Sequence, residues 1–164
     1  MSKKLPEIVC DVLLPDTQLL NEWEAGLPMW LLQVDHEITI NGKKYTARTG
    51  FKFNMANIPW GFRNTFNPTD PRSATATLWH DANCKGDFWP RKEGDILFRA
   101  LLIRGGMPKW KRAEMYIAVR VGSGSHAMKM TFSKKYRKKH EKERREIREL
   151  FGLPNSSVPL WEKL

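Results

Sequence analysis

The clearest pattern of hydrophobic and polar positions along the chain is an alternation that predicts a β-hairpin. Ile38 and Ile40 alternate with polar neighbours, and the alternation resumes after Asn41-Gly42. A period of two residues is typical of a strand with one buried face, and Asn-Gly readily takes the positive φ values of a tight turn. We therefore expect antiparallel strands at roughly 30–40 and 44–53.

Beyond residue 70 the hydrophobic positions recur three and four residues apart, which is the period of a helix with one buried face. The pattern predicts three helices, which run from Ala74 to Asn83, from near Lys92 to Gly105-Gly106, and from Lys109 to Arg120. Asp70-Pro71 or Ser73 can cap the first of them. A hairpin followed by helices indicates an α+β fold, in which a small antiparallel hairpin or sheet packs against three helices, plus a basic C-terminal helix.

The two ends of the chain carry weaker patterns. Residues 1–29 include three prolines, and we expect either irregular structure or a short helix around Asp16–Ala25, capped by Asp16. The run GSGSHAMKM after the third helix predicts a flexible hinge. These features divide the chain into an N-terminal segment over 1–29, a core domain over 30–124, and a basic helix with a tail over 125–164.

Charge changes the picture at the C-terminal end. The formal net charge is +10, and residues 132–152 hold nine Lys or Arg but only four Glu. Their sequence predicts a helix, capped by Ser133 and stopped by Gly152, that has almost no apolar face. A helix this polar is stabilised by charge pairs or by a partner rather than by the domain core. The candidate binding residues on it and in the tail are Lys134, Lys135, Arg137, Lys138, Lys139, Arg144, Arg145, Arg148 and Trp161.

A basic helix of this kind suits acidic partners, either nucleic acid or an acidic protein surface. The alternative is a solvated helix held by pairs four residues apart, such as Glu141–Arg145. Cys10 and Cys84 fit neither a disulfide framework nor a zinc site, which indicates a reducing compartment. The N-terminus resembles neither a signal peptide nor a membrane span, so we expect a soluble chain without a membrane span.

Three residues carry the candidate chemistry: His80 and Asp81 on the first predicted helix and Asp95 on the second. If Asp95 holds one nitrogen of His80, the other nitrogen can act as a general base on water. Asp81 beside it could bind a divalent cation. The alternative is that His80 and Asp95 form a buried hydrogen-bonded pair that fixes helix packing, while Asp81 is solvated. Spacing alone favours this structural alternative.

Several segments occur in an order that is known from one family. The hairpin leads into GFKFNMANIPWGF, and a His-Asp helix, GDILFRALLIRGG and AEMYIAVRVGSGS follow. Over roughly 30–124 this order resembles a family of phage and prophage proteins, domain of unknown function 1353. The positions that match the family pattern are Gly50, Phe51, Ile58, Pro59, His80, Asp81, Asp95 and Phe98.

Two positions depart from that pattern: Asn54 stands where the family usually has Asp, and Asn57 stands where it usually has Ser. If the polar cluster of the family is catalytic, Asn54 removes a metal ligand or a proton acceptor. A looser similarity links the trio to calcium-dependent phospholipases A2, in which a His activates water, its neighbour binds calcium and a later Asp orients the His. The present sequence lacks the glycine-rich calcium loop and the disulfides of those enzymes.

Three functions are consistent with these patterns. The first is a phage-encoded accessory or virion-associated protein, in the host cytoplasm or the virion, whose basic helix binds nucleic acid or a viral structural protein. The second is a metal-assisted hydrolase with His80 as base, Asp95 as orienting group and Asp81 as ligand of a divalent cation, the one cofactor considered. The third is an inhibitor of a host defence protein. Asn54 and the basic segment favour the first.

Overall fold

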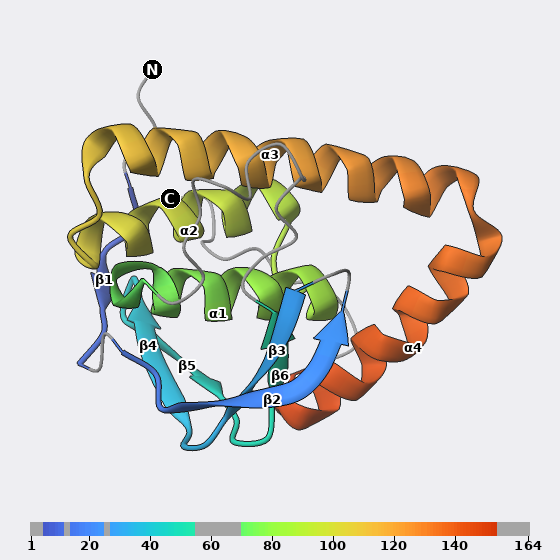
Figure 1. Ribbon diagram of the computed structural model, residues 1–164, viewed down its shortest axis with the longest axis horizontal. Coiled ribbons are helices and arrows are strands. Elements are labelled where there is room, and N and C mark those ends of the chain that lie inside the picture. The colour runs from blue at the N-terminus through green and yellow to red at the C-terminus, as the bar shows by residue number, and fades with distance from the viewer. Residues whose placement is uncertain (1–4, 12–13, 25–26, 55–69, 154–164) are drawn as a thin grey trace.

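The computed structural model describes residues 5–11, 14–24, 27–54 and 70–153, which form two antiparallel three-stranded sheets and four helices (Figure 1). This arrangement confirms the expected α+β class. The strands are β1 (Ile8–Val9), β2 (Thr17–Glu24), β3 (Leu27–Leu32), β4 (His36–Ile40), β5 (Lys43–Ala47) and β6 (Lys52–Asn54). The helices are α1 (Pro71–Gly86), α2 (Arg91–Arg104), α3 (Lys109–Phe132) and α4 (Lys134–Leu150).

The predicted hairpin is confirmed as β4 and β5, with Ile38 opposite Tyr45 and positive φ at both Asn41 and Gly42. The strands expected at 30–40 and 44–53 are each instead divided between the two sheets. β3 pairs with β2 and β6, whereas β4 pairs with β1 and β5. The break follows from Asp35, whose carboxylate leaves the ladder and accepts hydrogen bonds from the backbone N–H of Thr49, at 2.7 Å, and from the Arg48 side chain.

The helix expected over Asp16–Ala25 is wrong, because the described part of that segment is the edge strand β2. It pairs with β3 in antiparallel register, with Leu19 opposite Trp30. The local helix signal consisted of little more than a capping residue, and long-range pairing with an adjacent strand outweighs so weak a propensity. The described residues before 30 therefore extend both sheets, since β1 also pairs with β4.

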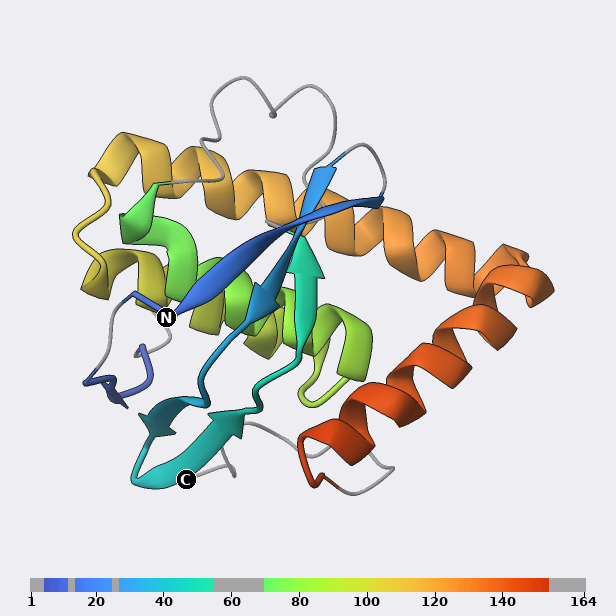
Figure 2. The ribbon, with the colours of Figure 1, turned by 60° about the horizontal axis from the view of Figure 1, so that its bottom comes forward.

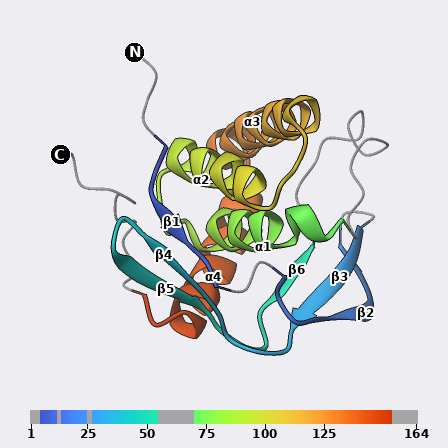
Figure 3. The ribbon, with the colours of Figure 1, turned by 90° about the vertical axis from the view of Figure 1, so that its left-hand side faces the viewer.

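Helix α1 forms the centre of the molecule (Figures 2 and 3), with the sheets on one side and α2 on the other. The Asp70 side chain caps it by accepting from the N–H of Arg72, as expected, and Pro71 occupies the first turn. Every residue from Ser73 to Gly86 is buried. Because the sheets and α2 surround the helix, its sequence has no strongly polar face, and the side chains of His80 and Asp81 are both buried.

The core between the sheets and α1 is aromatic. Its largest fully buried side chains include Trp79, Phe51 and Phe53. Phe151, just beyond α4, joins this core and meets Phe51 edge to face at 5.2 Å. The C-terminal extension is thus anchored in the body of the protein.

The flexible hinge expected after Arg120 is wrong, because α3 continues without a break to Phe132. Gly122 to Ser125 are poor helix formers, but they occupy helical turns here. Helix α3 lies outside α2, and its last turns extend beyond it before the chain reverses at Ser133 into α4 (Figure 1). Ser133 is the expected N-cap, since its hydroxyl accepts from the N–H of Tyr136.

Candidate functional site

The predicted contact between His80 on α1 and Asp95 on α2 is present. Nε2 of His80 lies 3.1 Å from Oδ1 of Asp95, and the two side chains are only 5% and 1% exposed. The other carboxylate oxygen of Asp95 accepts from Nη1 of Arg120 on α3 at 2.8 Å. One carboxylate therefore joins three successive helices.

Cys84, one turn after His80, completes the surroundings of the imidazole, and sequence reasoning missed it. Its sulfur lies 3.8 Å from Nδ1 and 3.9 Å from Nε2, so it sits beside the ring rather than in line with one nitrogen. Arg91 donates to the same sulfur at 3.2 Å. Phe98 covers the ring, with the two ring centroids 5.0 Å apart. The imidazole is enclosed on each of these sides.

The protonation of His80 decides what this site can do. Burial disfavours the charged form, but the Cys84 sulfur and the Asp95 carboxylate outweigh burial and raise the pKa of His80 to about 10. The shift favours the protonated ring, an imidazolium whose two nitrogens both carry hydrogen, beside the Asp95 carboxylate. In this form the ring cannot accept a proton from water, and the geometry is that of a buried ion pair.

Asp81 points away from this pair, toward the end of β6. One of its carboxylate oxygens accepts from the backbone N–H of Asn54 at 3.2 Å and pairs with Nζ of Lys85, also at 3.2 Å. Burial raises the pKa of the Asp81 carboxyl, and Lys85 opposes that rise. Lys85 also lies 3.4 Å from Glu24 and donates to the carbonyl of Lys52. The Lys85 ammonium thus lies among the oxygen atoms of Asp81, Glu24 and Lys52, in the position that a divalent cation bound by Asp81 would need.

Asn54 holds this polar cluster to the sheet, since its amide donates to Glu24 at 3.0 Å. Oδ1 of Asn54 and Oδ1 of Asp81 are both buried and lack a hydrogen-bond partner within the described part of the chain. Across 5–11, 14–24, 27–54 and 70–153 there is no group of three His, Cys, Asp or Glu side chains that could hold a metal ion. Asn57, Ile58 and Pro59 lie outside the described residues.

The basic helix presents most of its predicted binding residues to solvent. Lys134, Lys135, Arg137, Lys138, Lys139 and Arg145 are exposed, and Arg144 is half-buried. Trp161 lies outside the described residues.

Arg148 differs, because it is buried and serves as a structural anchor rather than as part of a binding surface. Its guanidinium donates to the carbonyl of Gly86 at 2.6 Å and to that of Asp87, and so satisfies the C-terminal carbonyls of α1. His140 is buried nearby, with Nε2 3.0 Å from the Asp87 carboxylate. The expectation that α4 would lack contact with the core is therefore wrong for this one face. The opposite face stays exposed.

Part of this network had a signal in the sequence. His80 and Cys84, like Asp81 and Lys85, are four residues apart on one helix, and this spacing places side chains together. Arg120 and Glu24 had no comparable signal, because tertiary packing alone brings them to Asp95 and Asn54.

The fold and this network define an α+β protein in which a His–Asp pair is sealed between two helices. A family model described as protein of unknown function (DUF1353) matches residues 30–119, and the chain belongs to this family. No curated protein and no solved structure matches the chain. No helix within the described residues has the length and apolar character needed to cross a membrane.

Proposed function

We propose that this protein is a phage-encoded accessory protein that binds nucleic acid through the exposed face of α4. The observation that carries the proposal is the position of the exposed basic residues. Lys134, Lys138 and Arg145 follow one another at spacings of four and seven residues, which places them on one side of the helix. Lys135 and Lys139 extend this basic surface by one row.

The opposite side of α4 supports the same proposal. Arg148 and His140 fix the helix to the turn after α1, so the basic face is held in one orientation. A row of charges on an anchored helix can follow a phosphate backbone at a smaller loss of conformational entropy than a disordered basic tail. Binding of this kind is electrostatic and indifferent to base sequence.

The test replaces three exposed lysines or arginines of α4 together, as Lys134→Ala/Lys138→Ala/Arg145→Ala. The matched control removes the same charge from other elements, where Lys43, Lys92 and Lys109 are also exposed. Binding to a fluorescent duplex is measured by anisotropy. We expect the α4 variant to bind at least tenfold more weakly than the control variant. Equal weakening of the two would show that only net charge matters, and would reject α4 as the binding surface.

An acidic protein partner is the competing result. Retention of the purified chain on a virion protein or a host defence protein, without measurable binding to duplex or single-stranded DNA, would replace nucleic acid by that partner. Detection of the chain in purified particles would place it in the virion, and its absence there would place it in the host cytoplasm.

A second candidate, the metal-assisted hydrolase, has one observation in its favour: the 3.1 Å contact between His80 and Asp95. Asp81 would be its cation ligand, and Asn54 would lie beside it. The hydrolase requires that a divalent cation raise the melting temperature and that Asp81→Asn abolish that rise. A melting temperature that is unchanged by calcium, manganese or zinc would reject it.

A further inference from the structure

The outer face of α3 carries an apolar stripe that the basic helix and the His–Asp site leave unexplained. It consists of Trp110, Ile117, Val121, Met128 and Phe132, whose side chains are between 51% and 82% exposed. Their spacings of seven, four, seven and four residues place them on one line along the helix. Glu114 and Ser125 lie on the same line, between the apolar residues. Isolated exposed apolar residues are ordinary on protein surfaces, but five of them along one face of a helix indicate an interface.

The second half of α3 contributes no buried side chain among the residues that the structure describes. Beyond Val119 none of the helix side chains that the structure describes is buried, although the helix continues to Phe132. Gly122 and Gly124 lie in this half, and a Cβ built at Gly124 would meet nothing within 4 Å. Glycines lower the helix propensity of this half, so packing of its exposed apolar side chains against another surface would stabilise it.

We propose that this stripe is the interface of a homodimer, in which α3 packs antiparallel against α3 of a second copy. Trp110 and Phe132 are each eleven residues from Val121. A two-fold axis at Val121 therefore sets Trp110 of each copy against Phe132 of the other. The same axis sets Ile117 opposite the small residue Ser125, so that large side chains meet small ones.

Charge and area agree with this pairing. Opposite positions about the axis bring Glu114 of one copy opposite Met128 and next to Lys129 of the other, so that a carboxylate–ammonium pair can form near each end of the stripe. At roughly 200 Å² for a large side chain, the exposed fractions amount to about 600 Å² per copy. Covering both stripes would bury about 1,200 Å², which is the low end for a specific interface.

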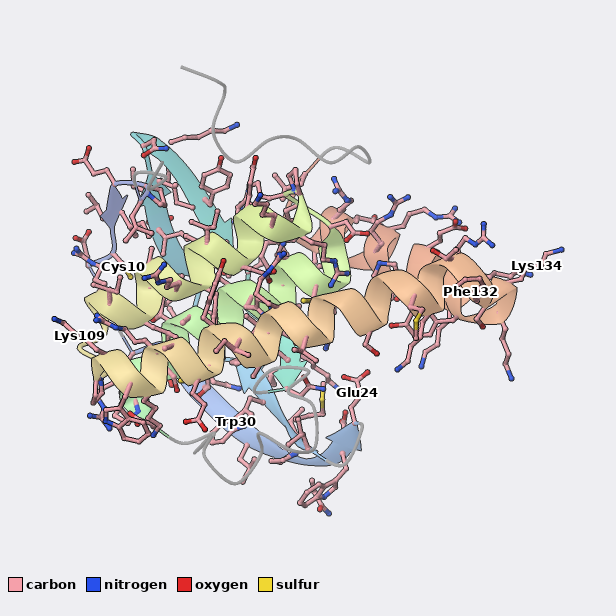
Figure 4. The ribbon with its side chains drawn as sticks, turned by 90° about the horizontal axis from the view of Figure 1, so that it is seen from above. Cys10, Glu24, Trp30, Lys109, Phe132 and Lys134 are labelled. Atoms are coloured by element: carbon pink, nitrogen blue, oxygen red, sulfur yellow. The ribbon has the colours of Figure 1, made fainter. Side chains whose placement is uncertain are left out.

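Figure 4 shows the molecule from the side of α3. Helix α3 lies nearest the viewer, with Lys109 at one end and Phe132 at the other, and α4 departs from the far end beyond Lys134. An antiparallel partner would thus carry its own basic helix at the opposite end of the pair. The dimer would present two basic helices, at its two ends.

Sedimentation equilibrium of the full chain tests the proposal. Interfaces at this end of the range include weak and transient ones, so the concentration series runs from about 1 µM to about 1 mM. We expect Val121→Lys, which sets two ammonium groups on the axis, to be monomeric at every concentration. The matched control is Trp23→Lys on β2, which is as exposed as Trp110 but lies elsewhere, and it should associate like the wild type. A monomeric wild type, or a Val121→Lys variant that still associates, would overturn the proposal.

Cysteine variants test the orientation independently of affinity. Under mild oxidation Val121→Cys should give a disulfide-linked dimer, because an antiparallel axis brings the two thiols together. Trp110→Cys and Phe132→Cys should each stay unlinked alone and link when mixed. Linkage of Phe132→Cys with itself would indicate parallel chains and reject the antiparallel arrangement. The wild type, whose Cys10 and Cys84 are buried, is the background control.

Salt separates this proposal from the binding of nucleic acid. Two chains of charge +10 repel each other, and screening that repulsion should strengthen the dimer, whereas the contacts of α4 with phosphate weaken. A dimer that dissociates as the salt concentration rises would be held by charged groups rather than by the apolar stripe. That result would overturn the proposed dimer.

Discussion

Replacing Asp95 by Ala removes the carboxylate that joins α1, α2 and α3. Its side chain is 1% exposed and accepts from His80 through one oxygen and from Arg120 through the other. Loss of one partner of a buried ion pair costs about 3–5 kcal/mol, because the remaining charge stays buried and uncompensated. His80 is 5% exposed and bears that penalty, whereas Arg120 is 44% exposed and can turn toward water. We therefore expect the low end of that range, about 3 kcal/mol.

Urea unfolding followed by tryptophan fluorescence measures this loss. For an m-value of about 2 kcal/mol per molar urea, a loss of about 3 kcal/mol lowers the midpoint by about 1.5 M. The matched control is Glu37→Ala, which also removes a carboxylate paired with a cation, Lys44, but from a surface position. An exposed pair contributes at most about 1 kcal/mol.

The double variant His80→Ala/Asp95→Ala tests whether the two residues act as a pair. It should cost less than the sum of the single changes, because removing His80 as well leaves no buried charge unpaired. A cost for Asp95→Ala within about 1 kcal/mol of wild type, or strict additivity of the two changes, would refute the interpretation as a buried ion pair.

Three further changes probe other parts of the structure. In urea melts, Arg148→Met should lower the free energy of unfolding by about 2–4 kcal/mol, because two carbonyls at the end of α1 lose their donors. The exposed control Arg145→Met should change it by less than about 0.5 kcal/mol. The pKa of His80 is raised in the folded state, so the stability it contributes is full below its unfolded pKa and is lost as pH rises toward 10. Between pH 7 and 10 wild type should lose more stability than His80→Gln in urea melts, and parallel curves would contradict the raised pKa. Gly105→Ala should destabilise the protein by about 1–3 kcal/mol, because the new Cβ would meet the backbone carbonyl of Arg72. Gly124→Ala, whose Cβ would meet nothing, should stabilise it by up to about 1 kcal/mol. Equal shifts of the two melting temperatures would contradict this difference.

Sequence patterns located the elements whose signals are local. The Asn41-Gly42 turn fixed the hairpin, and Asp70 with Pro71 fixed the start of α1. The pairing of His80 with Asp95 also followed from local reasoning, because each lies within a turn or two of the bend that joins α1 to α2, where the two helices pack side by side.

The features that sequence patterns missed depend on distant residues. β2 is a strand because it pairs with β3, and no local pattern within Thr17–Glu24 predicts that pairing. Arg148 has the same local signature as Arg145, yet only Arg148 meets the end of α1. The run Gly122 to Ser125 favours a hinge in isolation, and its helical state here requires support from packing that the sequence of α3 does not encode locally.

The dependence of DNA affinity on salt tests the role of α4 most directly. Five phosphate contacts from Lys134, Lys135, Lys138, Lys139 and Arg145 would give a slope of about −4 to −5 for log Kobs against log salt on duplex DNA. We expect this slope for wild type, and a slope smaller in magnitude by about 2 to 3 for Lys134→Ala/Lys138→Ala/Arg145→Ala. A slope near zero for wild type, or one that the three changes leave unaltered, would contradict binding through the exposed face of α4.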